Sequence, residues 1–202
     1  MAFRFGPKQY EQYEYVQIGT QKWMTRNLDV IRYRNGDPIP EVKDFTEWYN
    51  LTTGAWCYYN NDIKNGAIYG RLYNGYAVAD NRGLAPVGWH IPSNTEWNTL
   101  ASTLGGTSVA GKEMKEAGTM HWVEPNTGTN SSGFTALPGG ARLDSNPASD
   151  LFISLDAILW SSTTDFGLGH LHCTLFATFD ILQIYTTNGV NRLGCSVRCI
   201  KD

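Results

Sequence analysis

Residues 88–106 read GWHIPSNTEWNTLASTLGG and contain the clearest helix signal of this 202-residue chain. Ser93 can cap the helix with its hydroxyl, and Glu96 stands where its carboxylate can reach back and complete a capping box. The apolar residues that share one helical face are Trp97, Leu100 and Leu104, and the residues that stop the helix are Gly105 and Gly106. This stretch therefore predicts one well-defined helix with a core-facing side.

The sequence on both sides of this helix is rich in turn residues and aromatics, with 21 Gly, 7 Trp and 11 Tyr, so we expect few helices and many short strands. Two further short helices are predicted, at residues 74–80 and 110–116. EYVQIGTQKWMTRNL, residues 14–28, alternates as an opening strand does. GCSVRCI, residues 194–200, predicts a final short strand whose core-facing residues are Cys195, Val197 and Cys199.

Length and charge limit the classes of function. The length fits one domain at residues 15–202 with an amino-terminal extension at residues 1–14. A formal charge of -3 without any basic cluster argues against nucleic acid and anionic lipid as partners. The first residues lack the apolar core of a signal peptide, and no apolar run is long enough to span a bilayer, so we expect no direct membrane insertion.

The four cysteines, Cys57, Cys173, Cys195 and Cys199, show no C-x-x-C spacing, which argues against zinc-ribbon and thioredoxin-like sites. Cys195 and Cys199 are not expected to pair, because four residues of strand span about 13 Å and bridged Cα atoms lie within about 7 Å. A disulfide between Cys57 and Cys199 is left open.

Residues 161–198 contain no Lys, Glu, Met, Trp or Pro, although the first 160 residues use all five. The same segment mixes large apolar and aromatic side chains with Gly, Thr, Asn and Asp. That composition is typical of a paratope, in which rigid rings supply contact area and small polar groups supply adaptable hydrogen bonds. The alternative is a hydrophobic hairpin of the core, and composition alone does not decide between them.

Residues 170–179, HLHCTLFATF, alternate as a strand with two different faces. We expect one face to be presented to solvent, and its members are His170, His172, Thr174, Phe176 and Thr178. We expect the other face to be buried, and its members are Leu171, Cys173, Leu175, Ala177 and Phe179.

Seven motifs follow one another along the chain: VQIGTQKWMTRNL, WCYYNND, YGRLYN, GWHIPSNTEW, GFTALPGGAR, LWSST and SVRC. In this order they resemble the Fibrobacter succinogenes major paralogous domain, a bacterial and phage family with a C-type-lectin-like fold. The resemblance covers approximately residues 15–202. It implies an α+β fold with two short helices around a twisted, mostly antiparallel sheet, paired termini and long loops.

The resemblance also implies a source for the unusual composition of residues 161–198. Members of this family with a diverse carboxyl terminus are often targets of diversity-generating retroelements, which copy a template repeat while randomising its adenines. Randomising the first two letters of an Asn codon that ends in C excludes Lys, Glu, Met, Trp and Gln, and of these only Gln occurs in the segment, as Gln183. Cys195 is a second departure, since the family usually has an aromatic residue there.

In such members the variable stretch lies between WSST and SVRC, so the resemblance predicts a variable ligand-binding segment at about residues 165–193. The residues that we expect to contact a ligand are Asp165, Phe166, Leu168, His170, His172, Thr174, Phe176, Thr178, Phe179, Ile181, Tyr185, Thr187, Asn188 and Asn191. Presented rings among small polar groups favour a protein ligand over a simple sugar.

Other motifs carry competing hypotheses. Glu124, Pro125 and Asn126 spell the E-P-N with which animal C-type lectins hold calcium and a sugar, but no W-N-D triplet follows, and we interpret the match as coincidence. No cofactor is expected. If calcium binds, a structural site in the Asn/Asp-rich loops is favoured, and its candidate ligands are Asn60, Asn61 and Asp62.

Metal and enzyme chemistry receive little support. His170 and His172 share a strand face, but spacing supplies no third metal ligand. The fold also hosts formylglycine-generating enzymes, whose pair of active-site cysteines is not reproduced here. A Ser161, His90 and Asp165 set lacks a nucleophile elbow, so we expect no enzymatic activity.

The expected function is therefore non-enzymatic, hypervariable ligand binding for receptor recognition or adhesion. The ligand would be a protein or glycan on a cell surface, and the expected location is extracellular, at a phage fibre tip or on a bacterial surface. The alternatives are a glycan-binding lectin-like module of fixed specificity and a purely structural domain whose presented face is covered by another chain.

Overall fold

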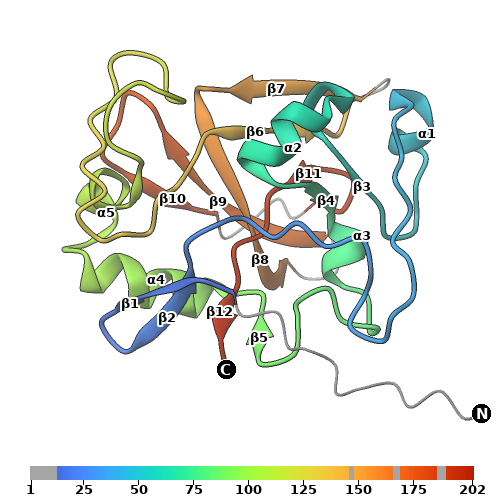
Figure 1. Cartoon of the computed structure of the whole chain (residues 1–202), viewed down its shortest axis with the longest axis horizontal. Helices are drawn as coiled ribbons and strands as arrows, with labels where there is room; N and C mark the ends of the chain where they lie inside the picture. The colour runs from blue at the N-terminus through green and yellow to red at the C-terminus, as the bar shows by residue number, and fades with distance from the viewer. Residues whose placement is uncertain (1–12, 146–147, 166–168, 186–189) are drawn as a thin grey trace, which may run out of the picture.

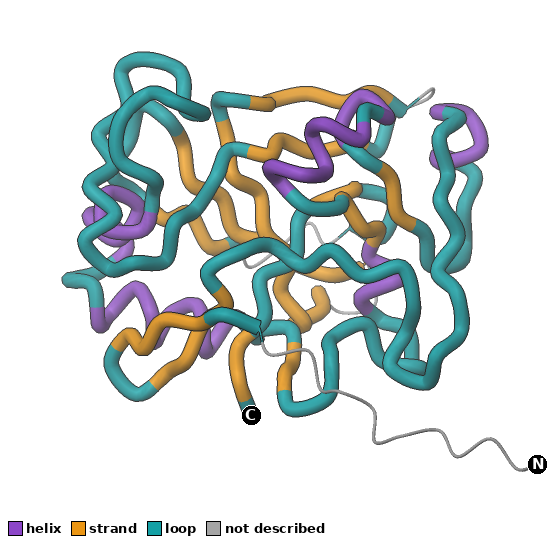
Figure 2. Tube along the Cα trace, viewed as in Figure 1, coloured by secondary structure: helices purple, strands orange, loops and turns teal. Residues whose placement is uncertain are grey.

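The computed structural model describes residues 13–145, 148–165, 169–185 and 190–202. These residues form two sheets and a set of short helices, which confirms the predicted α+β class and is compatible with a C-type-lectin-like fold. The larger sheet runs from the centre of the molecule to its upper edge, the smaller sheet lies at its lower edge, and helices and long loops flank them (Figure 2).

The smaller sheet brings the two ends of the domain together in the order β1-β2-β12-β5. Its strands are β1 (Tyr15–Ile18), β2 (Gln21–Met24), β12 (Ile200–Lys201) and β5 (Trp89–His90). The predicted opening strand is in fact a hairpin, and Gly19 reverses the chain with a φ of 59° that glycine adopts without strain. Because β12 pairs with β2, the two ends of the domain are neighbours, as the resemblance implies.

The larger sheet has the order β10-β9-β8-β6-β11-β4-β3, and β7 pairs with β6 (Figure 1). Its strands are β3 (Trp56–Cys57), β4 (Leu72–Asn74), β6 (Gly139–Leu143), β7 (Ser149–Ile153), β8 (Asp156–Asp165), β9 (Gly169–Phe176), β10 (Leu182–Ile184) and β11 (Gly194–Cys195). The pairs between these strands are antiparallel except that of β6 with β8. β9 and β10 form the end of the sheet that carries most of the predicted variable segment.

Helices are more numerous than the two that the resemblance implies, since the described ranges contain five. They are α1 (Phe45–Tyr49), α2 (Ile63–Tyr69), α3 (Gly75–Val78), α4 (Asn94–Thr103) and α5 (Thr107–Met114), and a 3-10 turn η1 spans Tyr59–Asn61. α4 is the helix predicted from GWHIPSNTEWNTLASTLGG, and both halves of its capping box are present. α3 and α5 correspond to the two weaker predictions. α1 and α2 were not predicted, because each is only a few residues long and begins at an aspartate cap rather than at an apolar repeat.

The core lies on both sides of the larger sheet because successive residues of β8 and β9 point to opposite faces. On one face Leu159, Cys173 and Leu175 join a cluster with Trp97 of α4 and Met114 of α5. On the other face Ile158 and Trp160 join a cluster with Tyr73 of β4. Cys195, Val197 and Cys199 also belong to this second cluster, which confirms their predicted core position. The single strand predicted over residues 194–200 is wrong, because Gly194–Cys195 pair in the larger sheet and Ile200–Lys201 pair in the smaller one.

All four cysteines are free and buried. The disulfide left open between Cys57 and Cys199 does not form, because Cys57 packs with Trp48 and Leu72 in a separate cluster from Cys199. Burial raises the pKa of the Cys199 thiol to about 12 and also raises the pKa values of the other three thiols, so each behaves as a small apolar side chain at neutral pH.

None of the helices found in the described ranges is long and apolar enough to cross a membrane.

Candidate ligand-binding surface

Within the predicted variable segment, residues 165–193, the described residues comprise the end of β8, β9, a turn at residues 177–181, β10 and residues 190–193 before β11. In Figure 1 the turn and β10 lie beside α5, at the margin of the molecule away from α1. The segment therefore combines a strand inside the sheet, a turn and an end strand, and its side chains have different degrees of exposure.

Most of the predicted contact residues within the described ranges reach solvent. These are His172, Phe176, Thr178, Phe179, Ile181, Tyr185 and Asn191. Asp165, His170 and Thr174 are buried instead. Phe166, Leu168, Thr187 and Asn188 lie outside the described residues.

The expected division of residues 170–179 into a presented and a buried face is thus wrong at three positions. Thr174 is 3% exposed because β9 lies between β8 and β10, where Thr174 stands between Ile158 and Gln183. His170 is buried with its ring against Trp160. Phe179, expected in the core, is 57% exposed because β9 ends at Phe176 and the turn breaks the alternation.

Two ring pairs dominate the exposed side of the segment. The Phe176 and Phe179 rings meet edge to face at 6.1 Å between centroids, and those of His172 and Tyr185 stack at 4.3 Å. Burial lowers the pKa of His172 to about 4, so its imidazole is neutral at physiological pH. Both pairs therefore act as uncharged aromatic surfaces.

Lys115, the residue after α5, holds the turn between β9 and β10. Its ammonium donates to the backbone carbonyl oxygens of Phe176, Ala177 and Phe179, each at 2.9 Å, and to the Thr127 hydroxyl at 3.0 Å. The side chain is fully buried, and burial lowers its pKa to about 8. The turn is thus fixed through its main chain, whatever side chains it carries.

α5 also holds the next residues of the segment by their backbone. The Lys112 amide donates to the Asp180 carbonyl oxygen at 3.2 Å. A methyl group at Gly111 would lie 2.7 Å from that oxygen and closer still to the carbonyl oxygen of Ile181, so only glycine permits this approach.

The other end of the segment is held in the same way. The Asn94 side chain, at the start of α4, donates to the Tyr185 carbonyl oxygen at 2.7 Å. The Trp48 indole donates to the Arg192 carbonyl oxygen at 2.7 Å. The donors are fixed residues of α4 and α1, and the acceptors are backbone atoms of the predicted variable segment.

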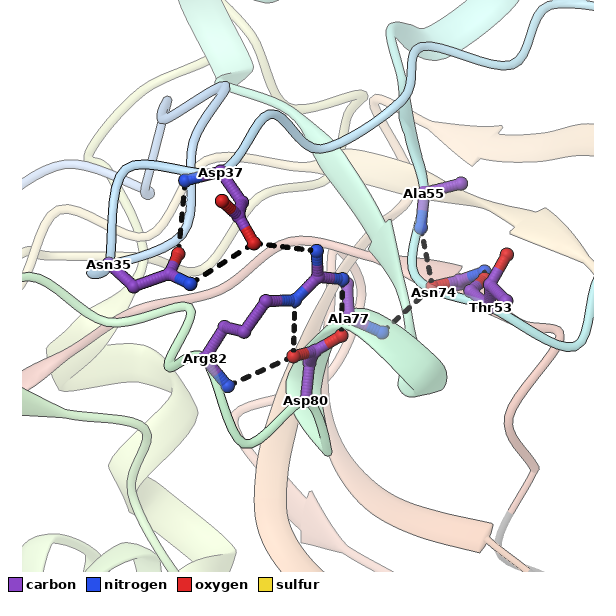
Figure 3. Close-up of polar contacts among 8 residues, drawn as sticks. All are labelled: Asn35, Asp37, Thr53, Ala55, Asn74, Ala77, Asp80 and Arg82. Carbon is purple, nitrogen blue, oxygen red and sulfur yellow. Dashed lines mark hydrogen bonds and ion pairs between the residues drawn. The ribbon is translucent and has the colours of Figure 1, made fainter.

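A third contact at this end depends on Asn74, which caps α3. Its side chain accepts from the amides of Ala55 and Ala77, both at 3.0 Å, and donates to the Thr53 carbonyl oxygen at 2.9 Å (Figure 3). This network positions Gly75, whose amide donates to the Asn191 carbonyl oxygen at 2.8 Å.

Figure 3 also shows the ion pairs that brace the chain after α3. Arg82 contacts Asp80 at 2.8 Å and Asp37 at 3.3 Å. The Arg82 guanidinium lowers the pKa of Asp80 to about 2. These ion pairs tie two loops together.

Some side chains of the segment also have a structural role. The Asn191 side chain accepts from the His170 amide at 3.3 Å, so it joins the two ends of the segment. Leu171, Cys173, Leu175 and Leu182 are buried in the core. Variation is therefore compatible with the fold at the exposed positions only.

The competing motifs have structural partners of their own. The Asn126 amide donates to the carbonyl oxygens of Glu116 and Gly118 and accepts from the Gly128 amide, so it shapes its own loop. The side chains of Asn61 and Asp62 accept from Arg142 and from the Lys64 amide. Within the described ranges no three His, Cys, Asp or Glu residues are grouped as metal ligands.

In the hypothetical Ser161, His90 and Asp165 set, His90 and Ser161 bond to other residues. Both ring nitrogens of His90 are taken, by Glu96 and by Asp202, each at 2.7 Å. Ser161 is buried and accepts from the Thr163 amide.

Sequence analysis missed Lys115, Asn94, Trp48 and Gly111 as residues that position the surface. KEMKE is typical of a solvated helix, so nothing local marks Lys115 as buried. A long-range donor to a backbone carbonyl leaves no pattern in the sequence.

A family model described as the Fibrobacter succinogenes major domain matches residues 16–201. No curated protein and no solved structure matched the chain.

Proposed function

Since the chain belongs to the Fibrobacter succinogenes major domain family, as its motifs predicted, we propose that it is a non-enzymatic binding protein whose residues 165–193 form a variable ligand-binding surface. The scaffold has the C-type-lectin-like fold, and the segment is diversified by a retroelement. The setting is receptor recognition or adhesion, at a phage fibre tip or on a bacterial surface.

One observation carries this proposal: scaffold donors hold the segment by its backbone carbonyl oxygens. Lys115, Asn94 and Trp48 all bind atoms that every amino acid possesses. The exposed side chains can therefore change without loss of these bonds. A fixed core hairpin would gain nothing from such independence, whereas a diversified surface requires it.

The binding mechanism is burial of the rings that reach solvent. The exposed Phe179 and the half-buried Phe176 and Tyr185 supply apolar area, and the exposed Thr178 supplies a hydrogen-bonding group beside them. Aromatic residues in such a position dominate the energy of protein interfaces. A protein ligand therefore fits this surface better than a simple sugar does.

A displayed library tests the proposal. Codons for His172, Phe176, Thr178, Phe179, Ile181 and Tyr185 are randomised together, and the fraction of folded clones is measured. A matched control library randomises the buried Leu171, Cys173, Leu175 and Leu182 of the same hairpin. We expect most clones of the first library to fold and to yield binders against unrelated proteins, whereas the control clones should unfold. Loss of folding in both libraries would contradict the proposal.

The gene supplies a second test. Sequencing its 3′ end from many sibling cells should show variation confined to codons 165–193, at adenines of a near-copy template repeat. Uniform codons without a template would favour the fixed lectin-like module. In that case a glycan array should show calcium-dependent binding that Glu124→Ala abolishes.

A further inference from the structure

A group of exposed apolar residues adjoins the turn between β9 and β10, at the start of β8. Phe179 is 57% exposed and Leu155 is 46% exposed. The Ala177 amide donates to the Leu155 carbonyl oxygen at 2.8 Å, which places Leu155 beside the turn. The edge-to-face pair of Phe176 and Phe179 completes this surface, here named the β8 corner.

Asp156 is the first residue of β8 and belongs to the same corner. It stands directly opposite Phe176 in the antiparallel pair, so the two side chains share one face with their Cβ atoms about 4.5–5.5 Å apart. Neither Leu155 nor Asp156 lies in the predicted variable segment. The corner therefore combines fixed residues with variable ones.

The Asp156 carboxylate has no hydrogen bond or ion pair with any residue in the described ranges. It is half-buried, and burial raises its pKa to about 6 without a contribution from any nearby charge. At neutral pH the carboxylate is thus ionised, partly removed from water and without a counter-charge. Pairing of such a carboxylate with a cation lowers the free energy.

We infer that the β8 corner receives a Lys or Arg side chain of a protein ligand. Asp156 pairs with the charged head, and Phe176, Phe179 and Leu155 pack against the aliphatic stem. A ring face close to a cation adds to the attraction, and Arg gains more because its planar fork can bind a carboxylate through two bonds. The inference rests on the proposed function and adds one fixed contact to it.

The geometry favours a basic side chain over the other occupants. An acidic or phosphorylated ligand would be repelled by Asp156. A purely apolar ligand would bury the carboxylate without a partner, which costs free energy. A neutral sugar could bond to the carboxylate but would leave its charge uncompensated.

The experiment selects peptides from a phage-displayed library of random dodecapeptides on the full chain. We expect the selected peptides to be enriched in Lys and Arg relative to the unselected library. A synthetic peptide from this selection should bind Asp156→Asn at least about tenfold more weakly than the unchanged protein. Glu47→Gln, which neutralises an exposed carboxylate on α1, is the matched control and should bind equally well.

A double-mutant cycle decides whether the contact is direct. Citrulline replaces the basic residue of the peptide with a neutral analogue of nearly the same shape as Arg. The citrulline peptide should bind the unchanged protein and Asp156→Asn equally.

Three results would overturn the inference: selected peptides without basic enrichment, equal binding to Asp156→Asn, or additive losses in the cycle. If such peptides still lose binding with Phe179→Ala or Tyr185→Ala, the proposed function stands without the basic contact. A chain that selects no peptide above the bare support contradicts both.

Discussion

Replacing Lys115 by Met should destabilise the protein and loosen the turn between β9 and β10. Met fills a similar volume but donates no hydrogen bond. The change leaves the carbonyl oxygens of Phe176, Ala177 and Phe179 without their buried donor. Each orphaned carbonyl costs about 1–3 kcal/mol, so the three together cost about 6 kcal/mol.

Removal of the buried charge offsets part of this cost. The lowering of the Lys115 pKa from 10.5 to about 8 means that keeping the ammonium charged destabilises the folded protein by about 3 kcal/mol at neutral pH. The net loss of unfolding free energy is therefore about 3 kcal/mol at pH 7. For a domain of this size the melting temperature should fall by about 6–12 °C.

The pH dependence of stability provides a second signature of the same residue. Between pH 8 and 10.5 the unfolded chain binds more protons at Lys115 than the folded one, because the folded pKa is the lower. The contribution of Lys115 to the unfolding free energy therefore rises with pH across this window. The difference between the unchanged protein and Lys115→Met should widen as the pH is raised, while other titrating groups cancel in the comparison.

Urea unfolding at pH 7 and pH 10, with hydrogen exchange of the amides in residues 176–181, measures both effects. Lys112→Met is the matched control, because that side chain is on the same helix and only the backbone amide of Lys112 contacts the segment. The control should change stability by no more than about 0.5 kcal/mol. Equal stability of Lys115→Met and unchanged exchange in the turn would refute the role of the ammonium.

Three further predictions concern the same surface. The double variant Phe176→Ala, Tyr185→Ala should abolish ligand binding while changing the melting temperature little. The control Leu175→Ala, in the core, should lower the unfolding free energy measured in urea by about 2–5 kcal/mol. A large loss of stability in the double variant would place the two rings in the core. Gly111→Ala should destabilise the protein by about 1–3 kcal/mol despite the helix preference of alanine, because the added methyl group meets the backbone of residues 180–181. A gain in stability would show that α5 does not lie in close contact with that backbone. Asp156→Asn should be about 1 kcal/mol more stable than the unchanged protein at pH 7 and equally stable near pH 4. The reason is that the folded pKa of Asp156 is raised to about 6, so the stability that its protonated form contributes is lost as the pH rises through that value. Equal unfolding curves of the two proteins at both pH values would contradict this.

The sequence predicts those parts of the fold that local chemistry determines. The capping box of α4 needs only Ser93 and Glu96, which are close along the chain, so it is visible in the sequence and present in the structure. Cys195, Val197 and Cys199 lie in the core as their alternation predicts, but the intervening Ser196 and Arg198 are buried as well, which alternation does not predict. The family itself follows from motifs that lie mostly in such locally determined regions.

What the sequence does not predict depends on contacts between distant residues. Lys115 is buried only because a turn more than sixty residues further along the chain brings carbonyl oxygens to its ammonium. Thr174 is buried where β10 pairs with β9 on the side away from β8, so that strands flank Thr174 on both sides. Phe179 is exposed because β9 ends before it. Alternation predicts which side chains of a strand share a face, but it does not predict which strands pair with it or where it ends. The predicted solvent-facing residues are therefore correct only where no other part of the fold buries them.

The four cysteines give the scaffold a practical property. Each sulfur lies in the core as a thiol, and none is bonded to another. Immunoglobulin domains, by contrast, commonly rely on a disulfide across their sandwich. This domain can therefore fold in a reducing cytoplasm, where collections of its variants could be produced and screened inside living bacteria without export or oxidative refolding.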